Sequence, residues 1–189
     1  MFPHTRLCLP HGEQGRVRFS GGMTMADGKR LYIMAGFDQE TERRLGRWET
    51  LLERGHPGPQ TKGIPHHITL GAYPPEMEEQ VRAMVAQAAR ETAPFPVCFD
   101  HLGLLGGGRV LFAAPSVDHA LLSLKERFGP CAGWAAHATL LIDEPETVLS
   151  AVGPAIGMFE AFEGRVERIF LHEFFPNCPI LHLPLEGGN

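Results

Sequence analysis

The sequence predicts an α+β protein made of two similar lobes related by a pseudo-two-fold axis, with antiparallel sheets lining a central groove. Three observations support this fold class. Segments with strand and helix patterns alternate, several neighbouring strands are joined by short turns, and one four-residue pattern occurs twice. The chain of 189 residues, 43% hydrophobic and 21% charged, has the composition of a globular protein and enough length for one substantial core.

The predicted elements begin after residue 28, because residues 1–28 are rich in Gly, Pro and polar residues and show no periodicity. We interpret residues 1–28 as an irregular N-terminal tail and residues 29–189 as a single bilobal domain. The predicted strands are 31–38, 66–73, 95–105, 109–114, 134–143, 164–174 and 180–185, and the predicted helices are 39–54, 74–92, 117–128 and 145–159.

Each type of element rests on its own pattern. The first strand is an almost continuous apolar run, and the helix after it has apolar residues at helical spacing, including Leu45 and Leu52. The helices at 74 and 145 begin with proline followed by acidic residues, which favour a helix N-terminus. The three glycines at 106–108 join two strands into a hairpin, and a Pro-Asn turn joins the last two strands.

An internal repeat is the most informative feature of the sequence. Residues 67–70 read His-Ile-Thr-Leu and residues 137–140 read His-Ala-Thr-Leu, and each histidine is followed by Pro-Glu at the same offset. In both copies the order is a strand, a Pro-Glu helix start, a helix, and a strand beginning near a phenylalanine, Phe95 or Phe162. The repeat therefore predicts two similar lobes.

The spacing within each motif predicts a catalytic constellation. Side chains on a strand alternate between its faces, so His67 shares a face with Thr69, and His137 shares one with Thr139. If the lobes face each other, two imidazoles and two hydroxyls meet in one groove. At neutral pH a neutral imidazole can act as base while a protonated one acts as acid, and hydroxyls can donate to phosphate oxygens. The pattern predicts acid–base chemistry on a phosphodiester that requires neither a metal nor another cofactor.

These motifs resemble those of the 2H phosphoesterase superfamily, whose members carry two H-h-[S/T]-h motifs (h, hydrophobic) in a duplicated bilobal fold. The resemblance extends from about residue 29 onward and is to the bacterial 2′-5′ RNA ligase and RNA 2′,3′-cyclic phosphodiesterase branch. It implies that His67 and His137 are the catalytic pair and that Thr69 and Thr139 bind the substrate phosphate. It also implies metal-independent hydrolysis of 2′,3′-cyclic phosphates, on RNA ends or nucleotides, with 2′-5′ RNA ligation as the reverse reaction.

Other residues near the motifs have predicted roles as well. His66 points away from the groove by the same alternation and is predicted to be a structural, hydrogen-bonded histidine. Base stacking requires an aromatic side chain at the groove rim. Tyr73, Trp134, Phe174 and Phe175 lie near the ends of predicted strands and are the candidates for this role.

Composition also limits the expected partners. No apolar run is long enough to cross a membrane, and no signal peptide is recognisable, so we expect a cytoplasmic protein without membrane contacts. The net charge of −5 argues against binding along a nucleic-acid backbone but not against binding one phosphate. The expected partner is an RNA end or a nucleotide with a 2′,3′-cyclic phosphate, and the expected form is a monomer.

Two alternatives remain open at the level of sequence. The ten histidines are numerous enough for a zinc hydrolase, although His66 and His67 are adjacent on a strand and therefore diverge. The other alternative is a nucleotide-binding module with the same groove but little or no turnover. Activity that survives a chelator argues against the zinc hydrolase. Nucleotide binding without hydrolysis would support the binding module.

Overall fold

The computed structural model describes residues 29–53, 64–174 and 176–187. The predicted tail at 1–28 lies outside the described residues, as do residue 54 of the first predicted helix and Phe175. The strands are β1 (Arg30–Phe37), β2 (His67–Tyr73), β3 (Phe95–Leu105), β4 (Val110–Pro115), β5 (Ala138–Ile142), β6 (Phe162–Phe174) and β7 (Cys178–Pro184). The helices are α1 (Gln39–Glu53), α2 (Glu78–Glu91), α3 (His119–Glu126) and α4 (Pro145–Met158), with a short 3-10 turn, η1 (Pro75–Met77), before α2.

The strands form one seven-stranded antiparallel sheet in the order β2-β1-β6-β3-β4-β5, with β7 paired to β6. The long strand β6 belongs to both halves of the sheet. Its first part, 162–166, pairs with β3, whereas its second part, 168–173, pairs with β7 on the same side and with β1 on the other. The predicted antiparallel α+β class is confirmed, and the two halves of the sheet are continuous through β6.

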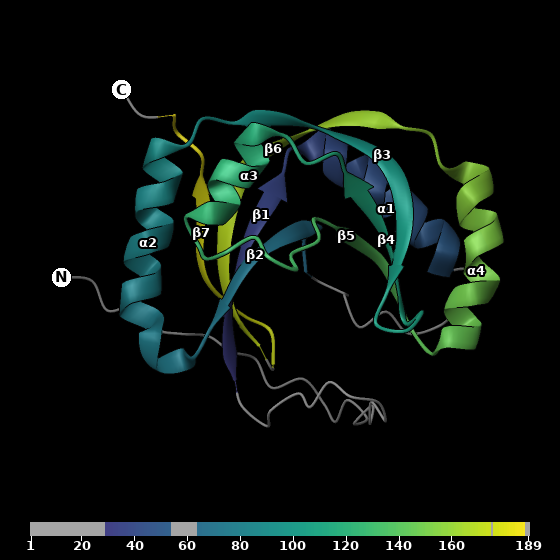
Figure 1. The fold of residues 1–189 in the computed structure, drawn as a ribbon, viewed down its shortest axis with the longest axis horizontal. Helices are drawn as coiled ribbons and strands as arrows, with labels where there is room; N and C mark the ends of the chain where they lie inside the picture. The colour runs from purple at the N-terminus through teal and green to yellow at the C-terminus, as the bar shows by residue number, and fades with distance from the viewer. Residues whose placement is uncertain (1–28, 54–63, 175, 188–189) are drawn as a thin grey trace.

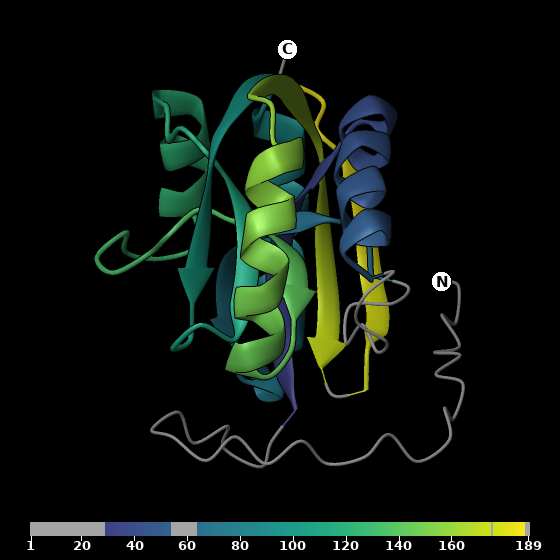
Figure 2. The ribbon, with the colours of Figure 1, turned by 90° about the vertical axis from the view of Figure 1, so that its right-hand side faces the viewer.

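Two lobes share this sheet (Figure 1). One contains β2, β1, the second part of β6 and β7, with α2 and α3 packed on it, and the other contains β5, β4, β3 and the first part of β6, with α1 and α4. Helix α1 follows β1 in the chain but contacts β5, and α3 follows β4 but contacts β2. Figure 2 shows α1 in blue and α3 in green on opposite sides of the molecule. Helix α1 therefore packs on the lobe that carries the second motif, and α3 packs on the lobe that carries the first.

The internal repeat is present in the backbone pairing as well as in the sequence. The chain repeats a strand–helix–strand–helix–strand unit, first as β1-α1-β2-α2-β3 and then as β4-α3-β5-α4-β6. Met34 is opposite Thr69 in the first unit and Phe112 is opposite Thr139 in the second, and the register shifts immediately before Met34 and before Phe112. The same irregularity thus lies beside the threonine of each motif. The third strand of each unit pairs with the other unit, β3 with β4 and β6 with β1.

The sheet buries apolar side chains on both of its faces. The main core includes Ile33 on β1 and Phe99 on β3, both 0% exposed, packed beneath the helices. A smaller cluster of Met34, Phe170 and Phe174 occupies the other face of β1 and β6. Glycine is favoured at position 36, because a Cβ atom there would overlap the ring of Phe170 unless that ring moved.

The fifth strand is shorter than predicted. The sequence predicts a strand over 134–143, whereas β5 begins at Ala138, the first residue that pairs with β4. His137 therefore lies at the entrance of the strand, outside the ladder. Among the described residues, no helix is long and apolar enough to span a membrane.

Candidate active site

The two histidine motifs lie on the two outermost strands of the main strand order, β2 and β5. The hydrophobic residues of both motifs are at most 2% exposed, whereas the histidines and threonines keep partly exposed side chains. The buried set is Ile68, Leu70, Ala138 and Leu140, and the partly exposed set is His67, Thr69, His137 and Thr139. The alternation predicted from sequence is confirmed, and the histidine and threonine of each motif share a face.

Both motif histidines are held in the same way. His67 Nδ1 lies 2.8 Å from the carbonyl oxygen of Pro65, and His137 Nδ1 lies 2.8 Å from the carbonyl oxygen of Ala135. A carbonyl oxygen can only accept a hydrogen bond, so each Nδ1 carries a proton and donates it. In a neutral ring the proton is therefore on Nδ1 and Nε2 is the basic nitrogen, an arrangement that is compatible with acid–base chemistry at Nε2.

The curl of the sheet brings the two motifs together. Although β2 and β5 are at opposite ends of the strand order, they contact each other, and Figure 1 shows them side by side at the centre of the molecule. The indole N–H of Trp134, three residues before His137, donates to the carbonyl oxygen of Thr69 at 2.8 Å. The charge of His137 also contributes to lowering the pKa of His67. These contacts place the two motifs beside each other, and a joint catalytic site of His67 and His137 stays a prediction.

His67 is electrostatically distinct within this site. Burial lowers the pKa of its imidazole, and the nearby charges of His137 and His66 lower it further, against the raising effect of the Pro65 hydrogen bond. The pKa of His67 therefore lies below the ordinary value of 6.5, and the ring is mostly neutral at neutral pH.

Two of the aromatic candidates connect the segments that carry the motifs. Tyr73 at the end of β2 donates its hydroxyl hydrogen to the carbonyl oxygen of Phe128 at 2.8 Å, and Trp134 donates to Thr69 as described. Lys125 holds the intervening loop, because its ammonium group donates to the carbonyl oxygens of Gly129 and Pro130 at 3.0 and 2.9 Å and lies 5.8 Å from the Trp134 ring. The polar atoms of Tyr73 and Trp134 are thus used within the protein.

The third aromatic candidate lies in the smaller cluster. Phe174 is 9% exposed and packs edge-to-face against Tyr32, with ring centroids 5.3 Å apart. Its neighbour Phe175 lies outside the described residues. Base stacking by Tyr73, Trp134 or Phe174 remains a proposal, with most of the Phe174 ring already covered by protein.

Two further histidines near the site were not predicted from sequence. His172 on β6 donates through Nδ1 to Asn177 at 2.8 Å, and its Nε2 lies 2.6 Å from Nε2 of His182 on β7. Burial, followed by the charges of His182 and His67, lowers the pKa of His172 to about 4, so this ring stays neutral. Strand alternation places His172 on the face of Phe170 and Phe174. The register that places His182 opposite Phe170 depends on the β6–β7 pairing, which sequence alone does not give.

His66 has the orientation predicted for it. Its Nδ1 lies 2.9 Å from a carboxylate oxygen of Glu42 on α1, so the ring is hydrogen-bonded away from the groove, and the structural interpretation is confirmed. Within residues 29–53, 64–174 and 176–187, no three His, Cys, Asp or Glu side chains are grouped closely enough to hold a metal ion.

A family model described as the 2′-5′ RNA ligase superfamily matches residues 37–174, which is more than half of the chain and includes both motifs. No curated protein sequence matches the chain.

Several solved structures share the fold at low sequence identity. The structure of Escherichia coli LigT complexed with ATP is 17% identical, with a TM-score of 0.60, and the alignment covers 83% of this chain and 97% of LigT. LigT complexed with 3′-AMP is 17% identical, with a TM-score of 0.56 and coverage of 83% and 98%. The protein TT0787 of Thermus thermophilus is 19% identical, with a TM-score of 0.57 and coverage of 85% and 100%. At these identities the likeness establishes the fold.

Proposed function

The chain belongs to the 2′-5′ RNA ligase superfamily of 2H phosphoesterases, and from this premise we propose that it hydrolyses 2′,3′-cyclic phosphates on RNA ends or nucleotides without a metal. Membership in this superfamily supports phosphoesterase or RNA ligase-like activity in general. The finer assignment rests on one observation: both motif histidines donate through Nδ1 to the carbonyl two residues earlier, which leaves two Nε2 atoms for proton transfer.

The proposed reaction needs two proton transfers. A neutral imidazole removes a proton from water, whose oxygen forms a bond to phosphorus, and the bond from phosphorus to one ribose oxygen breaks. The departing oxygen takes a proton from the protonated imidazole. The lowered pKa of His67 favours its neutral form and suits it to the role of base, with His137 as acid. In 2′-5′ ligation a 5′-hydroxyl takes the place of water: the base removes its proton as its oxygen bonds to phosphorus, and the 3′ oxygen leaves with a proton from the acid, so the two histidines keep their roles.

The threonines complete the proposed site. Thr69 and Thr139 share the faces of the two histidines, which supports a role for their hydroxyls as donors to the non-bridging phosphate oxygens as negative charge builds up. Nucleotide binding by this fold is supported by LigT structures complexed with ATP and with 3′-AMP.

The test is hydrolysis of the four nucleoside 2′,3′-cyclic monophosphates in excess EDTA, with the product isomer identified. We expect turnover in EDTA, a loss of roughly 10²- to 10⁴-fold for His67→Ala or His137→Ala, and a smaller loss for Thr69→Ala or Thr139→Ala. Circular dichroism checks that the variants remain folded. Activity that disappears in EDTA and returns with zinc would contradict the proposal, and nucleotide binding without any turnover would favour a binding module.

A further inference from the structure

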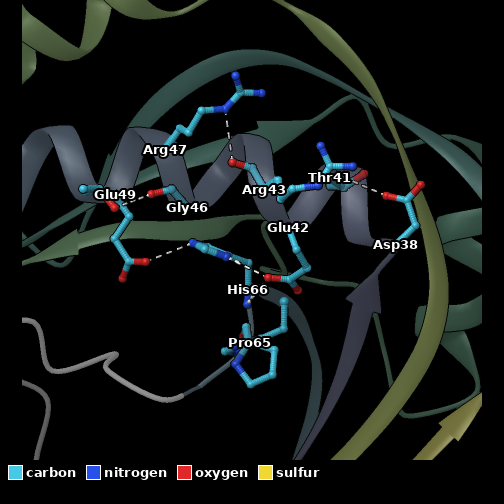
Figure 3. A network of polar contacts seen from close by, with 11 residues as sticks. Asp38, Thr41, Glu42, Arg43, Gly46, Arg47, Glu49, Pro65 and His66 are labelled. Atoms are coloured by element: carbon cyan, nitrogen blue, oxygen red, sulfur yellow. Dashed lines mark hydrogen bonds and ion pairs between the residues drawn. The ribbon is translucent and has the colours of Figure 1, made fainter.

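The imidazole of His66 lies between two carboxylates of one helix (Figure 3). Glu42 and Glu49 are seven residues apart on α1, which is close to two helical turns, so both side chains are on the same face. His66 Nδ1 is 2.9 Å from Glu42 Oε2, and His66 Nε2 is 3.4 Å from Glu49 Oε2. The first contact is a hydrogen bond and the second an ion pair at longer range.

These contacts imply a protonated imidazole. A carboxylate can only accept a hydrogen bond, so Nδ1 of His66 carries a proton, and Nε2 carries one as well when it faces the charge of Glu49. Burial alone would lower the pKa of His66, but the hydrogen bond to Glu42 and the close carboxylate of Glu49, together with the charges of both, outweigh burial and raise it to about 9. His66 is therefore a cation whose side chain is only 11% exposed, and its contacts with Glu42 and Glu49 connect the start of β2 to α1.

Glu42 also contacts the peptide group that orients His67. The same oxygen, Oε2, accepts a hydrogen bond from the backbone N–H of His66 at 3.2 Å. That N–H and the Pro65 carbonyl belong to one planar peptide unit. The Pro65 carbonyl in turn accepts from His67 Nδ1 at 2.8 Å. One continuous series of contacts thus runs from the Glu42 carboxylate through the 65–66 peptide to the imidazole of His67.

The second motif lacks this anchor. His137 donates to the carbonyl of Ala135 at the same distance of 2.8 Å, but the residue between them is Ala136, which has no polar side chain. The two halves of the site therefore share the bond from imidazole to carbonyl and differ in what fixes the peptide behind it.

We propose that Glu42 and His66 are positioning residues that hold the 65–66 peptide and so keep His67 in the tautomer with Nδ1 protonated and Nε2 available to substrate. The catalytic meaning of this inference rests on the proposed phosphoesterase function. The orientation of the His67 ring is independent of that function, and it can be measured without a known substrate.

The test compares Glu42→Ala and Glu42→Gln with Glu40→Gln as a matched control. Glu40 lies on the same helix, is exposed, and pairs with Arg43 and Arg44, so its replacement makes the same charge change away from His66. The readouts are the ¹⁵N chemical shifts of the His67 ring, which report its tautomer, and kcat and KM on the cyclic nucleotide that the wild-type protein hydrolyses.

We expect Glu42→Ala to give mixed His67 tautomers and a fall in kcat of about 10- to 100-fold, with KM within about twofold. Glu42→Gln keeps an oxygen that accepts from the His66 N–H, so it should lose less, and Glu40→Gln should match wild type. An unchanged His67 tautomer in Glu42→Ala overturns the inference.

Two controls separate the possible failures. If the wild-type protein turns over no cyclic nucleotide, the proposed function fails, but the ring shifts of His67 still decide the positioning role. If Glu42→Ala does not unfold cooperatively, the ring shifts in Glu42→Gln and His66→Gln carry the test. Loss of activity with equal loss of stability and an unchanged His67 tautomer would assign Glu42 to the fold alone.

Discussion

Adjacent histidines at the start of β2 have opposite electrostatic environments. Burial and neighbouring positive charge lower the pKa of His67, whereas Glu42 and Glu49 raise that of His66 to about 9. Alternation along the strand accounts for the difference, since one ring faces the groove and the next faces α1. The sequence predicts that the two rings point to opposite faces of the strand. It does not predict the partners of His66, because α1 and β2 are brought together by tertiary packing.

The raised pKa of His66 predicts how stability depends on pH. The folded protein holds this proton more tightly than the unfolded chain does, so the contribution of His66 to stability is complete below pH 6.5 and is lost as pH rises through about 9. The loss is at most about 3 kcal/mol. Glu42 and Glu49 are the titratable groups that raise this pKa. The lowered pKa of His67 affects stability only below about pH 6.5, so it does not contribute to the change at higher pH.

Urea unfolding at pH 6, 8 and 10 measures this effect in wild type and in His66→Gln. We expect the difference in free energy of unfolding between the two proteins to shrink as pH rises. A difference that stays constant over this range would show that His66 is not protonated in the folded protein.

At the scale of elements, the loop between α3 and β5 joins the two motifs. Trp134 donates to the Thr69 carbonyl, and Tyr73 donates to the Phe128 carbonyl, so the start of the second motif is hydrogen-bonded to the strand of the first. The sequence indicates Trp134 and Tyr73 as aromatic residues close to the motifs. Their hydrogen bonds depend on contact between β2 and β5, which no local pattern reveals.

Trp134→Phe separates hydrogen bonding from base stacking, because it removes the N–H donor and keeps an aromatic ring. We expect a loss of about 1 kcal/mol in stability and a lower kcat, with nucleotide affinity changed by less than about twofold. Thermal unfolding, steady-state kinetics and calorimetric titration with the mononucleotide product measure the three quantities.

Trp48→Phe is the control for this prediction, since Trp48 packs against Phe159 and Phe162 on the side of α1. It should lower stability without a separate effect on kcat. A Trp134→Phe protein with full stability and much weaker nucleotide binding would instead favour the stacking role.

At the scale of the whole molecule, the fold class and the repeat were predictable from sequence because each unit repeats its motif, its Pro-Glu helix start and its phenylalanine. The continuity of the sheet was not, since it depends on the length and pairing of β6. The length of β5 was overestimated at 134–143, because residues with strand character before Ala138 have no partner on β4.

The third strand of each unit pairs with strands of the other unit, and this predicts that neither half folds alone. Cleavage in the glycine turn at 106–108 would separate β1–β3 from β4–β7. The first fragment would lose both partners of β3, and the second would lose β1 and β3 and keep only β7 beside β6. We expect isolated fragments 1–107 and 108–189 to lack cooperative unfolding, and an equimolar mixture to recover the circular dichroism spectrum of the intact chain. A fragment that unfolds cooperatively by itself would show that the halves are independent.

The pairing of each third strand with the other unit is also consistent with an origin by gene duplication. A single strand–helix–strand–helix–strand unit could satisfy the backbone of its third strand by pairing with a second identical chain, which gives a two-fold symmetric dimer. Such an ancestor would hold two equal histidines in one groove and could not alter one without altering the other. Gene duplication and fusion remove that constraint, and His66 beside His67, against Ala136 beside His137, is a divergence that a dimer of identical chains cannot acquire.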